Sequence, residues 1–486
     1  MSTREQPPPE YAAFRVEQRG IDIIPPVERK GSPRALFWIW AGGLLNVEYV
    51  VNGALVIVLG LSFWQALFVI ILGNAMSWAA VGVASLQGPD TGTTSFVLSR
   101  APFGAQGARG VSFLNWLTLV GYETEGLLIV VLALLALSAK AGLTDSAGLK
   151  VVLILIAAAI QLFVPLFGHA TISKLFHYLS YAFIIMFAVL AIVAAPKIHV
   201  SAPHQHATTA GVFAGIALVL ALAGFGWTQQ GNDYSRYEPA TTRRSATFWA
   251  ATLGPLLPAT LLMILGAAIA TTVKSAADPI SGLPSVFPTW VIVPYLICAI
   301  IQLFCINSLD LYSSGLTLQA VGFRLRRWQA VLIDTVICAV LTYFVILSNT
   351  FSKVVSDFVL FTIVWLIPWF AIFMVDWLMR GRHYELDPLG QRGRGVFWRD
   401  GSVHLPGVAA QVLGMGAALL WLNASPAYIG PLASRTGGSD LNWILGPLVA
   451  VIVYLLLSWL ERKRRSADSD AGGGDLGHRI SDPTVS

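Results

Sequence analysis

Apolar residues fall in long, uninterrupted runs along this chain, and short polar stretches separate the runs. A helix needs about 20 mainly apolar residues to cross roughly 30 Å of hydrocarbon, and that length selects twelve segments. The predicted spans are residues 36–60, 65–86, 111–138, 149–168, 175–196, 210–229, 246–271, 290–318, 328–348, 356–379, 405–423 and 441–460. The pattern therefore predicts an all-α polytopic membrane protein with twelve transmembrane helices.

The composition supports a lipid environment. Charged residues make up 12% of the chain and hydrophobic residues 56%, whereas a soluble domain is about one quarter charged. The three cysteines, Cys298, Cys305 and Cys338, lie in apolar segments without metal-binding spacing, so we expect no metal site and no cofactor. The net charge of +5 is compatible with nucleic-acid binding, but the basic residues sit at span ends, so we expect no nucleic-acid partner.

Lysine and arginine are unevenly divided between the two sides that twelve spans define. If the N-terminus is cytoplasmic, all but six of the 31 basic residues fall in cytoplasmic segments. Those on the other side are Lys140, Lys150, Lys197, Lys274, Lys353 and Arg435. This bias follows the positive-inside rule. We therefore expect a multi-pass protein of the plasma (inner) membrane with both termini cytoplasmic, and the polar, Pro-rich first 35 residues show no signal peptide.

Four acidic side chains lie near the centres of predicted spans: Glu48, Glu123, Glu125 and Asp310. An ionisable group there costs about 2.5–3.5 kcal/mol on insertion scales, so such residues are functional candidates. The alternative is hydrogen bonding between helices, which is worth only about 0.6 kcal/mol on average. Glu123 and Glu125 point about 200° apart on a helix, so both cannot line one cavity. We assign Glu125 to packing and favour functional roles for the other three acids.

Glycines interrupt two of the predicted spans. Gly42 and Gly43 precede Asn46 in span 1, and the run Gly-Phe-Gly-Trp occupies 224–227 in span 6. Transporters built from inverted repeats have broken helices at matching positions of the two repeats, and spans 1 and 6 match in a five-plus-five repeat. Close helix packing also explains such glycines, and that alternative stays open. The predicted organisation is a tail at 1–35, repeats at 36–196 and 210–379, two further spans within 405–460, and a disordered tail at 461–486.

Four segments resemble the nucleobase:cation symporter-1 family, in particular its purine–cytosine permease branch. They are GPDTGTTSFVLSRAPFG at 88–104, WLTLVGYETEG at 116–126, GNDYSRYEP at 231–239 and NSLDLYSSGLTLQAVG at 307–322. The resemblance covers about residues 20–460. It implies a LeuT-type core of five plus five helices, two extra helices and alternating access. We interpret the DYSRYEP run after span 6 as a solvated loop.

The resemblance also implies a substrate ring held between aromatic residues of spans 3 and 6 and hydrogen-bonded by polar residues of spans 1, 3 and 8. In span 3 one register places the polar residue at Glu123 and the aromatic position at Leu119, while a shift of three makes Tyr122 the aromatic residue. We favour Glu123 and keep Tyr122 open. The candidate substrate-binding residues are Asn46, Tyr122, Glu123, Phe225, Trp227 and Asp310.

The coupling ion departs from the sodium-driven members of the family. Their ion lies between backbone carbonyls of span 1, which map near Gly42 and Leu45, and hydroxyls of span 8, which map onto Phe304 and Cys305. A hard cation requires oxygen ligands, and the last two positions carry none in their side chains. We therefore favour H⁺ over Na⁺ as the coupling cation. The candidate proton carriers are Glu48, Glu123 and Asp310.

These observations predict a secondary active transporter that imports a nucleobase or a related heterocycle by cation symport. Carboxylates in the site favour bases that present N–H donors, such as cytosine or adenine. The chain has no HExxH, GxSxG or phosphate-loop motif, so we do not expect an enzyme. The alternatives are a carrier of allantoin, hydantoin, a vitamin or an amino acid on the same fold, and, less favoured, a channel. Beyond the heterocycle and the lipid bilayer, we expect no obligatory protein partner.

Overall fold

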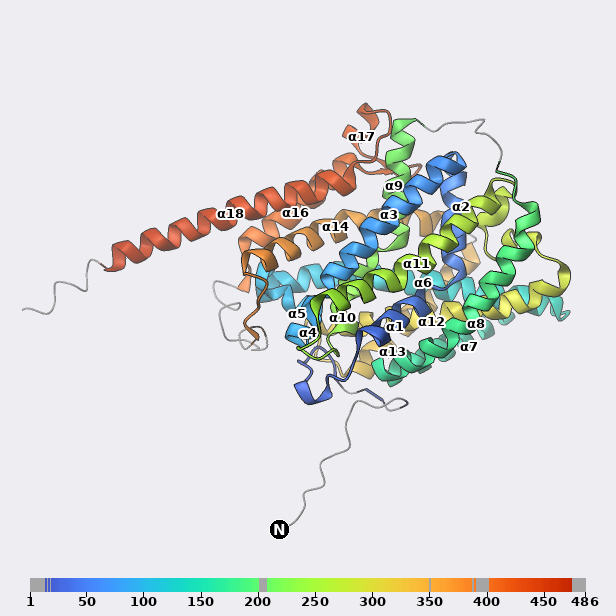
Figure 1. Ribbon diagram of the computed structural model, residues 1–486, viewed down its shortest axis with the longest axis horizontal. Coiled ribbons are helices and arrows are strands. Elements are labelled where there is room, and N and C mark those ends of the chain that lie inside the picture. Colours follow the sequence, from blue (N-terminus) through green and yellow to red (C-terminus); the bar gives the residue numbers. More distant parts are fainter. Residues whose placement is uncertain are drawn as a thin grey trace, which may run out of the picture.

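The computed structural model describes residues 14, 16–17, 19–200, 208–348, 351–386, 389 and 402–473 of the 486-residue chain. The beginning of the predicted N-terminal tail and the end of the predicted C-terminal tail, from residue 474, lie outside these residues. The described part is an elongated bundle of helices that run side by side (Figure 1). Within it the only strands form a two-residue antiparallel pair, β1 (Asn423–Ala424) and β2 (Tyr428–Ile429), with Asn423 opposite Ile429.

The helices follow the predicted apolar runs closely. The α-helices are α1 Pro33–Leu44, α2 Val47–Val58, α3 Phe63–Ala84, α4 Gln87–Thr91, α5 Ser95–Leu98, α6 Arg100–Lys140, α7 Ala147–Phe167, α8 His169–Ala194, α9 Thr209–Ala223, α10 Gly231–Ser235, α11 Arg244–Ala270, α12 Thr289–Val321, α13 Arg327–Ser348, α14 Phe351–Met379, α16 Leu405–Trp421, α17 Pro431–Arg435 and α18 Asn442–Gly473. The 3₁₀ helices are η1 Pro26–Glu28, η2 Ala195–Lys197, η3 Phe225–Gln230, η4 Lys274–Ala277 and η5 Leu283–Val286.

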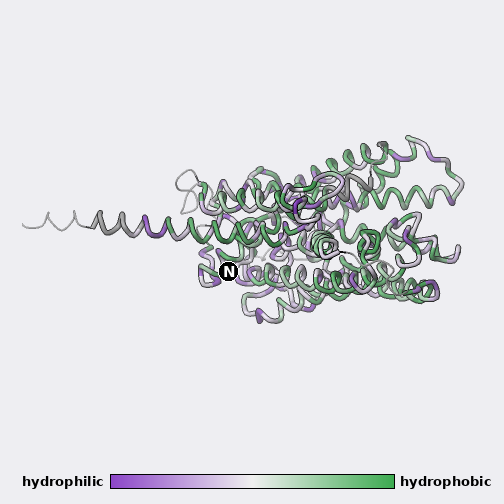
Figure 2. The backbone as a smooth tube through the Cα atoms, turned by 90° about the horizontal axis from the view of Figure 1, so that it is seen from above, coloured by the Kyte–Doolittle hydropathy of each residue, from purple (hydrophilic) through white to green (hydrophobic). Residues whose placement is uncertain are grey.

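Among the described residues, ten helices are long and apolar enough to cross a membrane. Helices α1 and α2 together make an eleventh span, bent by 59° at its break. Hydrophobic residues, coloured green in Figure 2, predominate along the helices of the bundle. The predicted all-α polytopic membrane fold is confirmed. The count of twelve spans stays a prediction because it includes α16, which has 17 residues and is shorter than the others.

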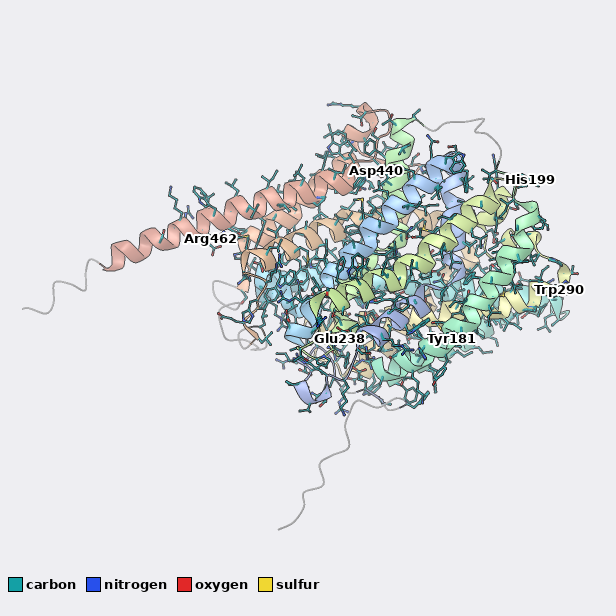
Figure 3. The ribbon with its side chains drawn as sticks, viewed as in Figure 1. Tyr181, His199, Glu238, Trp290, Asp440 and Arg462 are labelled. Carbon is teal, nitrogen blue, oxygen red and sulfur yellow. The ribbon has the colours of Figure 1, made fainter. Side chains whose placement is uncertain are left out.

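Helix α18 runs past the end of the bundle (Figure 1). It continues to Gly473, beyond the boundary at 461 where a disordered tail was expected. Arg462 lies on this extension, and Figure 3 places Arg462 and Glu238 toward one end of the bundle and His199 and Trp290 toward the other. The N-terminal segment lies at the end that carries Glu238.

The break in span 1 is held by one buried side chain. The Oδ1 atom of Asn46 accepts a hydrogen bond of 2.7 Å from the Glu48 amide, and its Nδ2 donates to the Gly43 carbonyl at 3.2 Å. Asn46 thereby caps the start of α2 and satisfies a carbonyl at the end of α1, two groups that a broken helix leaves without partners. The preceding Gly42 serves close packing, because an added Cβ would lie 2.7 Å from the Cβ of Phe176 in α8.

The break in span 6 is a change of helix type. Helix α9 ends at Ala223, Gly224 has φ −141° and ψ −19°, and the chain continues as the 3₁₀ helix η3 before α10 begins. An added Cβ at Gly224 would lie 2.6 Å from the Cβ of Ser77 in α3, so only glycine permits this approach. Both predicted interruptions are therefore present.

Replacing Asn46 by alanine is expected to lower the free energy of unfolding by about 1–2 kcal/mol, because an N-cap is lost and the Gly43 carbonyl loses its partner. Thermal unfolding of the purified protein in detergent measures the change. Asn46→Ser keeps an N-cap acceptor and should recover most of the loss. An alanine variant as stable as the unmodified protein would show that Asn46 does not hold the break.

Candidate functional site

An internal cavity with a volume of about 40 Å³ lies between the two interrupted spans and helices α6 and α12. One water takes about 30 Å³ in the liquid, so the cavity has room for roughly one water. A planar ring enters only after the surrounding helices move apart. The lining residues are Glu48, Tyr49 and Asn52 of α2, Tyr122 and Glu125 of α6, Ala221, Leu222, Gly226 and Trp227 of spans α9–η3, and Ile306, Asn307 and Asp310 of α12.

Three carboxylates meet at this cavity. Glu48 lies in the first turn of α2, where the helix dipole favours a negative charge, and it is within electrostatic reach of Glu125 and Asp310. The Oδ1 atom of Asp310 accepts a hydrogen bond of 3.0 Å from Gln230 Nε2. Among the described lining residues none carries a positive charge, and three adjacent carboxylates cannot all ionise cheaply. The cavity is therefore suited to hold protons or a molecule rich in hydrogen-bond donors.

Aromatic rings form the other wall. Tyr122 rests against the backbone of Gly226, where an added Cβ would lie 3.0 Å from the ring, and its hydroxyl is 3.4 Å from the Ala221 carbonyl. Trp227 lines the cavity and packs edge-on against Trp40. Of the two aromatic candidates in span 6, Trp227 lies at the cavity. Phe225 is absent from the described lining and packs against Phe370 of α14.

The structure places the two glutamates of span 3 opposite to expectation. Glu125, which was assigned to packing, lines the cavity. Glu123 lies on the other side of α6, where its Oε2 accepts a hydrogen bond of 3.2 Å from Cys338 Sγ and its carboxyl lies near Asp334. The two side chains point in different directions, as expected from helix geometry. Glu123, the residue favoured in the sequence analysis, is the one that faces α13. Helix geometry separates these residues without saying which one faces inward.

Other predicted residues lie near the cavity without lining it. Asn46 caps the break, and Gly42 and Leu45 belong to the end of α1 and the break itself. Sequence reasoning missed Tyr49 and Asn52. These two residues follow Glu48 at one and four positions along α2, so the helical spacing of a carboxylate and an amide was an available signal.

Asn307 ties α12 to α6 and α7 beside the cavity. Its Nδ2 donates to the Glu123 carbonyl at 3.2 Å and to Gln161 Oε1 at 3.1 Å. The contact is close because Gly126 of α6 lacks a side chain, and an added Cβ there would lie 2.1 Å from Asn307 Oδ1. The structure gives Asn307 both a packing contact and a place at the cavity.

A second polar cluster lies at the end of the bundle that carries the N-terminal segment. We call it the Glu17 cluster; it comprises Glu17, Arg236, Tyr237, Tyr312 and Arg327. The carboxylate of Glu17 accepts hydrogen bonds from the hydroxyls of Tyr237 and Tyr312, and lies 3.9 Å from Arg236 Nη2. Arg327 lies over the ring of Tyr312. The cluster joins the N-terminal segment to the end of span 6, to α12 and to α13.

The charges in this cluster control the ionisation of Glu17. Burial alone would raise its pKa, but the guanidinium groups of Arg327 and Arg236 and the hydrogen bond from Tyr237 outweigh burial. The pKa of Glu17 therefore lies below its ordinary value, and the residue is ionised at neutral pH. The interpretation of DYSRYEP as a solvated loop is wrong, because the side chains from Asp233 to Glu238 are buried. Arg236 finds its partner in a segment remote in sequence, which local composition does not reveal.

Comparisons with known proteins find relatives over most of this chain. A family model described as permease for cytosine/purines, uracil, thiamine and allantoin matches residues 23–446. A Bacillus subtilis protein, YxlA, whose name assigns it provisionally to the purine-cytosine permeases, is 28% identical over 93% of this chain and 98% of its own. The purine-cytosine permease fcyB of Emericella nidulans is 27% identical over 93% of this chain and 90% of its own.

The solved structures that resemble this chain share its fold. Mhp1, a nucleobase-cation-symport-1 family transporter solved in a closed conformation with bromovinylhydantoin bound, has a TM-score of 0.70 at 16% identity, covering 91% of this chain and 96% of its own. A Na⁺-coupled sialic acid symporter has a TM-score of 0.57 at 11% identity, covering 89% of this chain and 91% of its own. These likenesses concern the arrangement of helices.

Proposed function

Because this chain belongs to the family of permeases for cytosine/purines, uracil, thiamine and allantoin, we propose that it carries a nucleobase-like heterocycle together with a proton. It is a transporter and not an enzyme. Transport proceeds by alternating access, with the central cavity between α2, α6, η3 and α12 as the substrate site. The inward direction of transport is part of the proposal.

The observation that carries this proposal is the set of three carboxylates facing aromatic rings around one cavity. Stacking of a base on an aromatic side chain is worth about 1–3 kcal/mol and tolerates many rings. Selection among bases therefore depends on hydrogen bonds at the ring edge, and buried polar groups reject analogues that leave them unpaired. Carboxylates accept hydrogen bonds from N–H groups, so this cavity favours amino-substituted bases such as cytosine and adenine.

Proton coupling is favoured over sodium coupling by the chemistry of the same region. The family resemblance implies that Phe304 and Cys305 map onto positions where sodium-driven members have hydroxyls, and these two side chains supply no oxygen ligand for a hard cation. Carboxylates crowded into one cavity can take up and release a proton as the cavity opens and closes. Uptake of cytosine or adenine into proteoliposomes should follow an imposed pH gradient. Uptake that follows a sodium gradient and ignores the pH gradient would refute the coupling.

The position of the two glutamates in span 3 gives a paired prediction. Glu125→Gln should reduce cytosine uptake at least about tenfold, since a hydrogen bond to a charged group contributes about 1.5–3 kcal/mol, and should flatten the dependence of uptake on external pH. Glu123→Gln should retain uptake within about twofold. Initial rates in proteoliposomes between pH 5 and 8 test both variants. The reverse pattern would show that Glu123, and not Glu125, is the substrate-binding glutamate of span 3.

We also propose that the chain resides in the plasma (inner) membrane with both termini in the cytoplasm. The support is the concentration of basic residues in the segments that alternate with the spans. Arg236 and Arg327 lie with the N-terminal segment, as this topology requires. Labelling of single cysteines at Ser32 and Asp278 with a membrane-impermeant reagent should modify only the second position in intact cells.

A further inference from the structure

A second, larger cavity lies between α4 and the end of α14, at the face of the bundle where the N-terminal segment packs. Its volume is about 220 Å³, and its lining includes Gln87, Thr91, Trp377, His383 and Tyr384. Since one water takes about 30 Å³ in the liquid, it has room for roughly seven waters. This volume exceeds that of a one-ring or two-ring heterocycle, in contrast to the volume of the central cavity.

Two polar groups among the side chains that line this cavity are buried without a partner in the described part of the chain. They are the Nε2 of Gln87, a residue with 0% exposure, and the hydroxyl of Tyr384, with 4% exposure. A buried unpaired donor costs about 1–3 kcal/mol, and a bound molecule with acceptor atoms removes that cost. The Oε1 of Gln87 already accepts a hydrogen bond of 3.0 Å from Asn232 Nδ2. That bond orients the Gln87 amide and leaves the N–H groups of its Nε2 for another partner.

The chemistry of the lining points to a neutral aromatic molecule. Trp377 and Tyr384 are buried aromatic side chains in the lining, and such rings stack on flat heterocycles. Charged residues of both signs occupy the rim, and Asp90 is paired with Arg244 at 2.8 Å. A cavity without an excess of either charge does not select a phosphate or a carboxylate, whereas Gln87 offers donors to a ring carbonyl or ring nitrogen.

Polar side chains connect this cavity with the central one. Asn232 of α10 bonds Gln87 at the edge of the second cavity. Two positions earlier in the same segment, Gln230 bonds Asp310 at the central cavity. The end of span 6 therefore bonds one lining residue of each cavity.

We propose that the cavity formed by Gln87, Trp377 and Tyr384 is a second binding site for a neutral planar heterocycle of the class carried by the central site. The identity of the ligand class rests on the proposed function. The site holds the heterocycle on the N-terminal side of the bundle, which the proposed topology places in the cytoplasm. Each chain therefore binds two molecules of the same base.

Equilibrium binding of radiolabelled cytosine and adenine to the purified full-length chain in nanodiscs tests this site. We expect two molecules per unmodified chain and one per chain for Trp377→Leu. Asp310→Ala, which removes the central site, should also bind one, and the double variant should bind none. Trp459→Leu, an exposed tryptophan on α18 remote from both cavities, serves as the control and should bind two.

Gln87→Glu provides an independent variant, because glutamate keeps an acceptor for Asn232 and loses the donor. It should weaken binding at the second site at least about tenfold and leave the central site as an internal measure of folding. One molecule per unmodified chain, or unchanged stoichiometry in Trp377→Leu, would overturn the second site while leaving the proposed function intact. One molecule bound to Asp310→Ala, and none bound to the double variant, supports the second site even without transport. Absence of binding to every form of the chain would overturn both proposals.

Discussion

Asp310→Asn is expected to reduce the uptake of cytosine and adenine by about 10- to 100-fold, the effect of losing about 1.5–3 kcal/mol from a hydrogen bond to a charged group. Asparagine retains an oxygen that can accept the hydrogen bond from Gln230 Nε2, which measures 3.0 Å in the native chain. The fold around η3 is therefore preserved. The substitution changes only the hydrogen bonding between residue 310 and the edge of the substrate ring. The new amide also brings an N–H donor into the cavity.

That donor predicts a change in preference as well as a loss. Uracil and hypoxanthine present a carbonyl where cytosine and adenine present an amino group, so their uptake relative to cytosine should rise in the asparagine variant. Competition of unlabelled bases against a labelled one in proteoliposomes gives the ratio directly. Thermal unfolding of the variant controls for folding. Cytosine uptake within twofold of the native rate, with an unchanged preference among the bases, would show that Asp310 does not bind the substrate.

Arg236→Ala is expected to destabilise the chain by about 3–5 kcal/mol, the usual cost of removing one partner from a buried ion pair. The Arg236 side chain is fully buried, donates to the Gly20 carbonyl at 2.8 Å and to the Tyr312 hydroxyl at 3.1 Å, and lies beside the carboxylate of Glu17. Without Arg236, the buried carboxylate of Glu17 is near only one guanidinium group among the described residues, that of Arg327. Thermal unfolding in detergent measures the loss.

Arg244→Ala is the matched control. Arg244 forms a pair of 2.8 Å with Asp90, but its side chain is 49% exposed, and pairs of this kind contribute about 0–1 kcal/mol. The two variants should therefore differ by several degrees in melting temperature. Equal melting temperatures would show that the Glu17 cluster does not hold the N-terminal segment to the bundle.

The same cluster sets a pH dependence on the acid side. The pKa of Glu17 in the folded chain lies below its ordinary value of 4.5. Its contribution to stability is complete above the pKa of the unfolded chain and is lost as the pH falls through the lower, folded value. Unfolding measured from pH 6 downward should show this loss in the native chain. Glu17→Gln, which cannot ionise, should lack that part of the dependence.

Hydrophobic patterning was sufficient to predict the helical membrane fold, because each span needs the same length of apolar chain. The glycines of spans 1 and 6 were the local signal for the two interruptions. The cavity was predicted less completely. The candidates that line the cavity are Asp310, Glu48, Tyr122 and Trp227. Glu125 also lines it, although the sequence analysis assigned Glu125 to packing and favoured Glu123. The rotation of α6 about its axis decides between these two residues, and it is fixed by contacts such as that of Gly126 with Asn307, which join segments far apart in sequence.

The Glu17 cluster marks a different limit of sequence reasoning. Its arginines look like members of solvated loops when each is read with its neighbours. They are buried because a carboxylate from the N-terminal segment reaches them. Such pairing depends on which segments meet after folding, and no local pattern encodes it.

The small volume of the central cavity has a thermodynamic consequence. If the wider form that admits a ring is populated only a fraction of the time, the measured dissociation constant equals the intrinsic constant divided by that fraction. Moderate affinity for a nucleobase then coexists with tight contacts once the ring is enclosed. Two bases that fit equally well can differ in apparent affinity solely because one requires a wider opening between α6 and η3. Selectivity for the size of the base therefore depends on the population of the wider form as well as on the contacts with the bound ring.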